Sequence, residues 1–542
     1  MITPLSLDLV EYIVDQSGSV DILADGLQRD HRGRPFNKQL LRTLLIGWLL
    51  TNQEQGTMRI KDVHKVLTTR LDRDSQLRLG IVVSRHGIDQ TINRSPLDAM
   101  VRRLEDGLGY GTGTHPHLEN AERTRRERVI TAFSDALLDM FNTGFTSTSY
   151  AIDGSGIWTW GKSRRRRPNV DQLNKDGDAN PDANIPESDP DAAWGSKTSK
   201  DGSPESVFGY HLHALVRVPG KTSKGKQQPV EDEPRLVHRI GITPANADIV
   251  DVSLDMIDRL NNSATSNGPA NITDLIVDSH YHYKKVGRWI KQLLNRGIRQ
   301  HHDLRTDETK FMSYQQMRFF GGDAHCPATP DRLADLTPLP PDPSSEQIVE
   351  FRSVNDEREQ FAMVRHTAVN AAGQVRVKCP ALEGKVGCPH RTGTVQAATQ
   401  HGLPVLNAAD VKFDDMPACC TQQGVKITLP DEILKHAQPY FWGSKAWRSE
   451  YNKRTYVESL FGNMKNDASE NVRRGMHRHV GIAFNHLHLS LAAANFNLRT
   501  LRKWHQDTGK GDTGNPLLAN VTVQTTNVKR PTRGTRRPRW AA

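Results

Sequence analysis

The sequence predicts an α/β fold with an all-helical region before the core and a long insertion within it. Before residue 145, apolar residues recur with helical spacing, whereas short β-prone runs begin at Thr148. Two of these runs end in an aspartate. All five cysteines of the 542-residue chain fall within residues 306–440, where prolines and short β-like runs interrupt the pattern.

The composition indicates a basic protein with an acidic partner. The formal net charge is +10, which favours nucleic acid without specifying a sequence. On charge alone, a basic globular protein with no such partner remains the alternative. We expect no signal peptide and no membrane span, because no apolar run is long enough and unbroken by polar residues. An odd number of cysteines fits a reducing compartment, so we expect a cytoplasmic, nucleoid-associated protein.

Residues 1–144 are predicted to form an all-helical domain that binds DNA. Apolar residues at helical spacing mark amphipathic helices around Leu41 to Leu49, Ile60 to Leu67, Ser95 to Leu104 and Ile130 to Phe141. The cationic side chains among them suit contact with DNA. A helical bundle with a solvated basic face is the alternative, and the sequence does not select a recognition helix.

Residues 145–305 are predicted to hold the first part of the core. Thr148 to Asp153 is typical of a strand that ends in an aspartate, followed by the flexible backbone of Gly154-Ser-Gly156. Two further strands and a helix follow, at Phe208 to Val218, Arg235 to Thr243 and Ile249 to Leu260.

Residues 168–203 are predicted to form an acidic loop, solvated or disordered. Between Asp171 and Asp191 there are seven acidic residues against one lysine, and almost no apolar side chains. Such a composition cannot bury a core.

Asp274 to Asp278 predicts a fourth strand, an apolar run that ends in a second acid. Three strands, a helix, and then a strand with an acid at its carboxyl end is the order of an RNase H-like α/β core. In open α/β sheets, ligands bind at that edge. A single aspartate there is usually a turn or helix cap, but two in this order indicate a site.

Residues 306–440 predict an inserted domain of mixed, β-rich structure. It contains Cys326, Cys379, Cys388, Cys419 and Cys420. Four thiolates, or three with His390, are the donor set of a structural tetrahedral zinc site. No CxxC pair is present, and scattered buried thiols are the ordinary alternative. The sequence therefore leaves a structural Zn²⁺ open without requiring it.

Residues 441–505 are predicted to return to the core as helices, with residues 506–542 as a basic, disordered tail. The first helix carries an aromatic residue, two cations and an acid. At roughly 100° per residue, these four share an arc of about 60°. They are Tyr451, Arg454, Glu458 and Lys465, and Val457, Leu460 and Met464 form the buried stripe beside them.

Asp153, Asp278 and Glu458 are the candidate catalytic residues and metal ligands. Converging carboxylates repel one another unless a cation is present. Their oxygens are the ligands that Mg²⁺ prefers. Two Mg²⁺ (or Mn²⁺) ions about 4 Å apart would activate a water or a 3′-hydroxyl and stabilise the leaving oxygen.

Three further residues of the same helix are candidate DNA contacts. Arg454 and Lys465 suit phosphates, and Tyr451 suits a phosphate or an unpaired base. No GxxxxGK[ST] phosphate loop is present, so ATP is not expected to drive the reaction.

The pattern Tyr-x2-Arg-x3-Glu-x6-Lys resembles the signature of DDE transposases of the IS4 group. Asp153 and Asp278 fall where that group places its first two catalytic acids, and the Phe208-Gly-Tyr-His-Leu-His segment is also similar. The resemblance covers roughly residues 30 to 505. It implies that the three acids bind metal and that Tyr451, Arg454 and Lys465 contact the terminal DNA strand.

The expected function is therefore that of a DNA transposase from an insertion sequence. It would bind terminal inverted repeats in double-stranded DNA, cleave there, and join the 3′-OH ends to target DNA. Cutting two ends together implies a homodimer in a synaptic complex. The rival hypotheses are an RNase H-like DNA nuclease without strand joining, and a catalytically silent DNA-binding protein derived from a transposase.

Overall fold

We analysed the protein as a computed structural model. The structure describes residues 2–27, 36–85, 88–163, 187–198, 204–219, 222–224, 229–263, 271–282, 284–305, 308–334, 336, 339–340 and 342–523. The chain divides into two compact units, Met1–Asn271 with Thr455–Thr525 and Ile272–Arg454 with Thr526–Ala542. We call these the first and second unit. Their boundaries lie at 271/272 and 454/455, whereas the sequence placed the insertion between 306 and 440.

The first unit begins with helices, as the sequence predicted. Its helices are α1 (Pro4–Gln16), α2 (Ser19–Leu27), α3 (Lys38–Gln55), α4 (Ile60–Thr69), α5 (Arg73–Arg78), α6 (Ser95–Leu108) and α7 (Asn120–Asp139). The four predicted helices are confirmed, whereas α1, α2 and α5 were not predicted. The prediction that residues 1–144 are all helical is wrong, because strands β1 (Val82–Arg85) and β2 (Ile88–Thr91) form an antiparallel hairpin.

A sheet of long antiparallel strands follows. Its strands in the first unit are β3 (Ser149–Trp158), β4 (Ala193–Thr198), β5 (Pro204–Arg217) and β8 (Val237–Pro244). A separate hairpin joins β6 (Thr222–Lys224) and β7 (Pro229–Glu231). Strand β5 pairs with β3 along one edge and with β4 and β8 along the other. Helix α8 (Ile249–Ser263) contacts β8 and β5. The three predicted strands and this helix are confirmed.

Asp153 does not end its strand, and in this respect the prediction is wrong. β3 continues for five residues beyond it, through Gly154 and Gly156. These glycines allow β3 to pack closely against side chains of β5. A Cβ on Gly154 would stand 3.0 Å from Nδ1 of His213, its partner on β5. Pairing with a longer neighbouring strand therefore extends β3 through a segment with weak β propensity.

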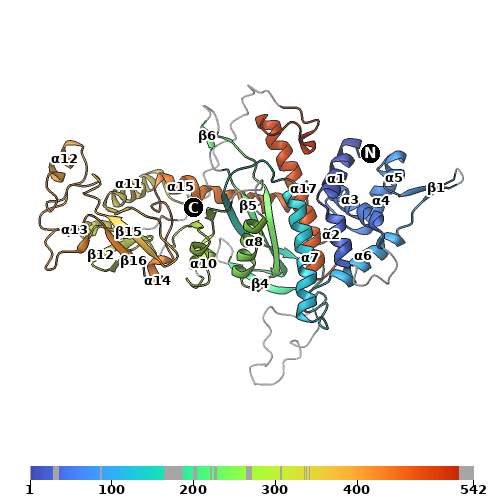
Figure 1. Cartoon of the computed structure of the whole chain (residues 1–542), viewed down its shortest axis with the longest axis horizontal. Coiled ribbons are helices and arrows are strands. Elements are labelled where there is room, and N and C mark those ends of the chain that lie inside the picture. Colours follow the sequence, from blue (N-terminus) through green and yellow to red (C-terminus); the bar gives the residue numbers. More distant parts are fainter. Residues whose placement is uncertain are drawn as a thin grey trace, which may run out of the picture. The chain divides into compact units, whose positions relative to one another are not determined.

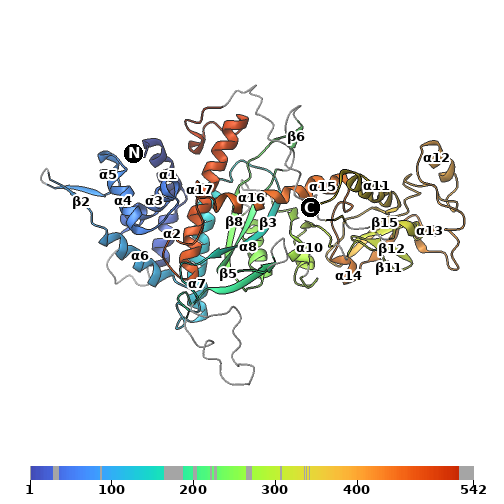
Figure 2. The same ribbon diagram turned by 180° about the vertical axis from the view of Figure 1, so that it is seen from behind.

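The first unit closes with α16 (Thr455–Met464), the long helix α17 (Ile482–Thr508) and the short turn η5 (Pro516–Leu518). α17 runs beside α7 in both views (Figures 1 and 2). The prediction of a disordered tail from residue 506 is wrong for residues 506–523. Leu517 and Leu518 are buried, and Arg502 donates to the carbonyls of Leu517 and Ala519. Residues 524–542 lie outside the described residues.

The prediction of a solvated or disordered acidic loop is wrong for residues 187–198, the part of it that the structure describes. Asp189 is fully buried and accepts hydrogen bonds from the Thr159 and Tyr210 hydroxyls and from the Gly481 amide. Asp191 accepts from the amides of Gly113, Thr114 and Ile482 and from the Thr114 hydroxyl. Both carboxylates cap the N-terminal end of α17, where backbone N–H groups lack helical partners. Residues 168–186 and 199–203 lie outside the described residues.

The second unit begins with parallel strands β9 (Asp274–Ile276) and β10 (Arg299–His301), with α9 (Ser279–His282) and α10 (Ile290–Asn295) between them. Two antiparallel three-stranded sheets follow. One is β11 (Met312–Tyr314), β12 (Met317–Phe320) and β13 (Asp323–His325), and the other is β14 (Val364–Arg365), β15 (Gln374–Lys378) and β16 (Val425–Thr428). The predicted mixed structure of residues 306–440 is confirmed, whereas the predicted β-rich character is wrong over the described residues, where helices contain more residues than strands.

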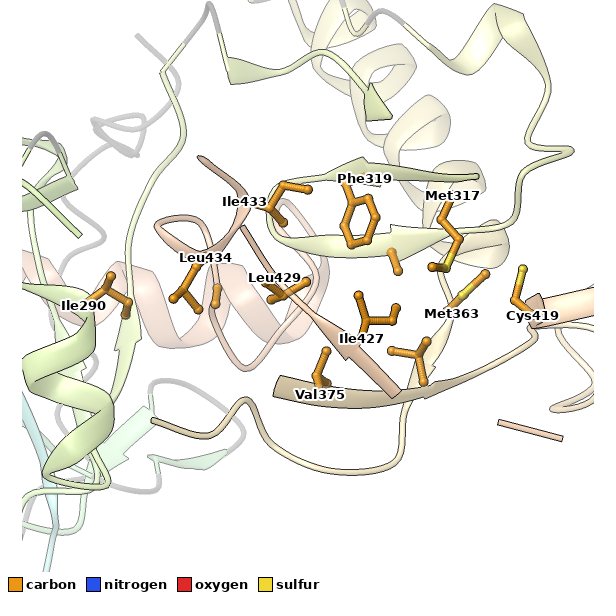
Figure 3. Close-up of a cluster of buried hydrophobic side chains, with 13 residues drawn as sticks. Ile290, Met317, Phe319, Met363, Val375, Cys419, Ile427, Leu429, Ile433 and Leu434 are labelled. Atoms are coloured by element: carbon orange, nitrogen blue, oxygen red, sulfur yellow. The ribbon is translucent and has the colours of Figure 1, made fainter. Parts of the chain in front are cut away.

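Helices complete the second unit. They are α11 (Ser345–Phe361), α12 (Thr394–Gln400), α13 (Ala418–Thr421), α14 (Asp431–Leu434) and α15 (Lys445–Tyr451), with 3₁₀ turns η3 (Asp331–Leu333) and η4 (Asn452–Arg454). α11 begins with a capping box between Ser344 and Gln347. Figure 3 shows one of the unit's cores, where Phe319 and Met317 face Ile427 and Val375. The unit thus has cores of its own.

In the described part of the chain, no helix is both long and apolar enough to cross a membrane.

The contacts of Asp191 yield a prediction about stability. Asp191→Ala leaves three backbone amides and one hydroxyl without their acceptor, so we expect a loss of about 2–4 kcal/mol in the free energy of unfolding. Equilibrium urea unfolding, followed by near-ultraviolet circular dichroism, measures it. The control is Asp507→Ala, which removes a surface pair with Lys503 on the same helix. Its expected cost is about 0.5 kcal/mol or less. Equal losses in the two variants would contradict the assigned role.

Candidate functional site

The helix predicted from Tyr451 to Lys465 is interrupted. α15 ends at Tyr451, the 3₁₀ turn η4 spans Asn452–Arg454, and α16 begins at Thr455. A 3₁₀ turn has about three residues per turn, so the predicted common arc does not hold across it. Tyr451 and Arg454 belong to the second unit, and Glu458 and Lys465 belong to the first.

In the first unit, the helix that carries Glu458 packs on the strand that carries Asp153. α16 contacts β3 and β5. Val457, Leu460 and Met464 are buried, which confirms the predicted apolar stripe, and Glu458 is exposed. Asp153 is half-buried, and its Oδ1 accepts from the Gly154 amide at 2.7 Å. The two acids therefore lie on elements in direct contact.

Lys465 links the two elements directly. Its Nζ donates to the Ser155 hydroxyl and to the Gly156 carbonyl, both at 2.8 Å. Ser155 lies two residues after Asp153 on β3. The ammonium group is thus fixed close to the strand position of the first acid, where it adds positive charge. Its hydrogen bonds hold the C-terminal end of α16 on β3.

In the second unit, Arg454 lies beside Asp278. The Arg454 Nη2 and the Asp278 Oδ2 are 3.2 Å apart, and both side chains are partly buried. The other oxygen of Asp278 accepts from the amide of Ser279 at 2.6 Å and from its hydroxyl at 3.2 Å. Asp278 therefore caps α9, and it also pairs with a residue of the signature that lies far from it in sequence.

Asp303 is a further acid near this pair, and the sequence analysis did not find it. Burial raises the pKa of Asp303 and nearby Asp278 raises it further, whereas the Trp442 indole, the Leu304 amide and the Arg454 charge lower it. The Trp442 indole N–H donates to its Oδ1 at 2.8 Å. Its position could have indicated it: Asp303 lies two residues after β10, as Asp278 lies two residues after β9.

Tyr451 lies against an aromatic cluster in the same unit. Its ring stacks on Trp447 with centroids 4.9 Å apart and 13° between the planes. The Trp447 indole is fixed by the carbonyl of His302 and the amide oxygen of Gln438. The aromatic ring of Tyr451 is therefore held in place by its neighbours.

Two exposed tryptophans lie at the end of β3 in the first unit. Trp158 is 42% exposed and Trp160 is 40% exposed. The guanidinium carbon of Arg478 stands 4.9 Å from the Trp160 ring centroid, and Arg474 donates to the carbonyls of Trp160 and Gly161. Exposed rings beside arginines are typical of surfaces that bind single-stranded nucleic acid. The exposed tryptophans were not predicted from the sequence.

The donor chemistry of the three predicted acids fits a hard divalent cation. Asp153 and Glu458 belong to the first unit and Asp278 to the second. Across the described residues, no group of three or more histidine, cysteine, aspartate or glutamate side chains forms a ready-made metal site.

Comparison with known proteins gives no assignment. No protein-family model matches the chain, and neither a curated protein nor a solved structure gives a match.

The bond network of Lys465 can be tested by a double-mutant cycle. Lys465→Met removes both hydrogen bonds to β3, and we expect it to lower the free energy of unfolding by about 1–2 kcal/mol. Ser155→Ala removes one acceptor, so the two changes should couple by about 0.5–1.5 kcal/mol. Urea unfolding of the four proteins measures this. Lys412→Met, on an exposed residue of the second unit, should stay within about 0.5 kcal/mol of the wild type. Strict additivity of Lys465→Met and Ser155→Ala would contradict the contact.

Proposed function

We propose that this protein is a DDE transposase of the IS4 type, with an RNase H-like catalytic core. Its proposed reaction is cleavage at the ends of a DNA element and joining of the freed 3′-OH ends to target DNA. The proposal rests on the Tyr451, Arg454, Glu458 and Lys465 signature, preceded by two acids in the appropriate order.

Contacts within each unit support this proposal. In the first unit, α16 with Glu458 packs on β3 with Asp153, and Lys465 bonds to the same strand. In the second unit, Arg454 of the signature pairs with Asp278. The strand order is also appropriate along the chain, since antiparallel β3, β5 and β8 are followed by α8 and then by β9, with Asp278 two residues beyond its end.

Asp153, Asp278 and Glu458 are the residues proposed to hold two Mg²⁺ or Mn²⁺ ions. These ions would supply Lewis-acid activation of a water or 3′-hydroxyl and neutralise charge on the leaving oxygen. The chain itself supplies carboxylate ligands and fixed cations. Glu458 is exposed and thus accessible to a DNA end, and Asp153 is oriented by the Gly154 amide.

The cations and the aromatic ring of the signature are proposed to position the DNA strand. Arg454 can bind a phosphate through two parallel hydrogen bonds, whereas Lys465 acts as a point charge. Tyr451 has its ring held against Trp447, which reduces the entropy lost when it contacts DNA. Because two element ends must be cut together, we propose a homodimer on paired ends.

The catalytic assignment predicts a separation of cleavage from binding. Asp153→Asn, Asp278→Asn and Glu458→Gln each remove a charged metal ligand. We expect Mg²⁺-dependent cleavage to fall by about 10³-fold or more, which corresponds to a rise of about 4 kcal/mol in the activation free energy. Binding of the same DNA should persist. The measurement is cleavage and strand transfer on DNA carrying the element's own flanking ends.

The matched control is Asp467→Asn, an exposed acid paired with Arg473 beyond the end of α16. It should cleave as the wild type does. Full activity in any one of the three variants would refute that residue's role. Cleavage without joining would favour the nuclease, and DNA binding without cleavage by the wild type would favour the silent DNA-binding protein.

The exposed tryptophans and arginines at the end of β3 predict a second DNA contact. Trp160→Ala should weaken binding to single-stranded or frayed DNA by about 1–3 kcal/mol, because a stacking surface is lost. Arg478→Ala should weaken binding and reduce the slope of log K against log salt by about one. Fluorescence anisotropy over a salt series measures both. Arg332→Ala changes an exposed arginine paired with Glu357 in the second unit, and it should leave the slope unchanged. Slopes that fall equally for Arg478→Ala and Arg332→Ala would rule out a specific contact.

A further inference from the structure

Four of the five cysteines surround one small cavity in the second unit. The cavity has a volume of about 10 Å³, and its lining includes Cys326, Cys379, Cys388, Cys420, His390 and Arg391. A space of this size holds about one water molecule or one metal ion. Cys326, Cys379 and Cys388 also belong to a single buried cluster. The cysteines come from separate segments of the chain, so the fold brings them together.

Three of the cysteines begin the same kind of turn. Cys326, Cys379 and Cys388 are each followed by proline, and the carbonyl of each accepts from the amide three residues later. The three bonds measure 3.0, 3.1 and 2.9 Å. Proline in the second position presets such a turn. A cysteine that serves only as a small apolar side chain in a core does not require such a turn.

Backbone amides are directed at two of the sulfur atoms. The amides of Ala328 and His390 donate hydrogen bonds to the sulfur atoms of Cys326 and Cys388, respectively. In both cases the donor lies two residues after the cysteine, within its turn. The same amides can donate to the thiolate, which is the form that binds a metal.

Positive charge and a fixed histidine complete the surroundings. Arg391 donates to the carbonyls of Cys419 and Gln422, which ties it to the segment that carries Cys420. The Nε2–H of His390 donates to the Val411 carbonyl at 2.6 Å. The Arg391 guanidinium offsets part of the negative charge that four thiolates would bring.

We propose that Cys326, Cys379, Cys388 and Cys420 bind one structural Zn²⁺ ion in the second unit. Four thiolates are a closed tetrahedral ligand set, which leaves no open position for catalysis. Each thiol gives its proton to solvent as its sulfur binds the metal. Since no ready-made group of three ligands is present among the described residues, the sulfurs must draw together around the ion. The site would cross-link four segments of the chain within the second unit.

Cys419 provides a matched control. It is buried in a neighbouring hydrophobic cluster near Met363, against which Cys420 also packs (Figure 3). It does not line the cavity. The five cysteines therefore divide into four proposed ligands and one residue of the neighbouring core.

The test is metal analysis of the full-length chain, purified without added metal. We expect about one zinc per chain in the wild type and in Cys419→Ser, falling below about 0.2 per chain in Cys379→Ser or Cys388→Ser. Zinc-free wild type, or zinc lost equally from Cys419→Ser, would overturn the proposal. So would loss of zinc from His390→Ala with retention in Cys420→Ser.

Because a cysteine variant can fail to fold, a second measurement uses the wild type alone. Exchange of zinc for Co²⁺ should produce the intense visible bands and the sulfur-to-metal charge-transfer band of tetrahedral thiolate coordination. Chelation should raise the number of rapidly reactive thiols by about four and lower the midpoint of thermal unfolding. Weak octahedral Co²⁺ bands, or a disulfide between any two of these cysteines, would refute the site. Neither readout depends on DNA cleavage.

Discussion

Two buried aspartates hold the first unit together. Asp189 joins the end of β3, strand β5 and the start of α17 through Thr159, Tyr210 and Gly481. Asp191 joins the start of α17 to residues 113 and 114. Burial raises the pKa of Asp189, opposed by the hydrogen bonds it accepts. The helix end supplies donors that would otherwise lack partners, so the acids and the helix satisfy one another. The position of β3, and with it Asp153, depends on this contact.

Composition misled the sequence analysis at these residues. Asp189 and Asp191 lie at the end of an acidic, apolar-poor segment, and such segments are usually solvated. Nothing local indicates that two of its acids meet a helix N-terminus almost 300 residues later in the chain. Asp153 illustrates a similar limit, since Gly154 and Gly156 suggested a strand end until pairing with β5 was known. The apolar periodicity correctly predicted which side chains are buried along single helices, as in α3 and α16.

The candidate site was predictable in its residue types and only partly in its geometry. The spacing of the signature identified Glu458 and its buried neighbours. Asp278 follows β9, but the strand ends at Ile276, two residues earlier than predicted. The break at η4 was not predictable, because the turn Asn452–Arg454 contains no glycine or proline to mark it. Asp303 escaped notice for another reason: it follows the polar run Arg299-Gln-His-His302, whereas Asp278 follows the apolar run Leu275-Ile-Val277.

The pair between Arg454 and Asp278 has a thermodynamic consequence under the proposed function. The Arg454 guanidinium cannot bind both Asp278 and a DNA phosphate at full strength. Likewise, one carboxylate oxygen of Asp278 cannot bind both Arg454 and a metal ion at full strength. A cation bound at Asp278 would therefore free Arg454 for phosphate, and a phosphate bound by Arg454 would free Asp278 for the cation. The two ligands would then bind with positive cooperativity, and each would raise the affinity for the other by the same factor. In the absence of DNA, the arginine would compete with the metal and keep the acid masked.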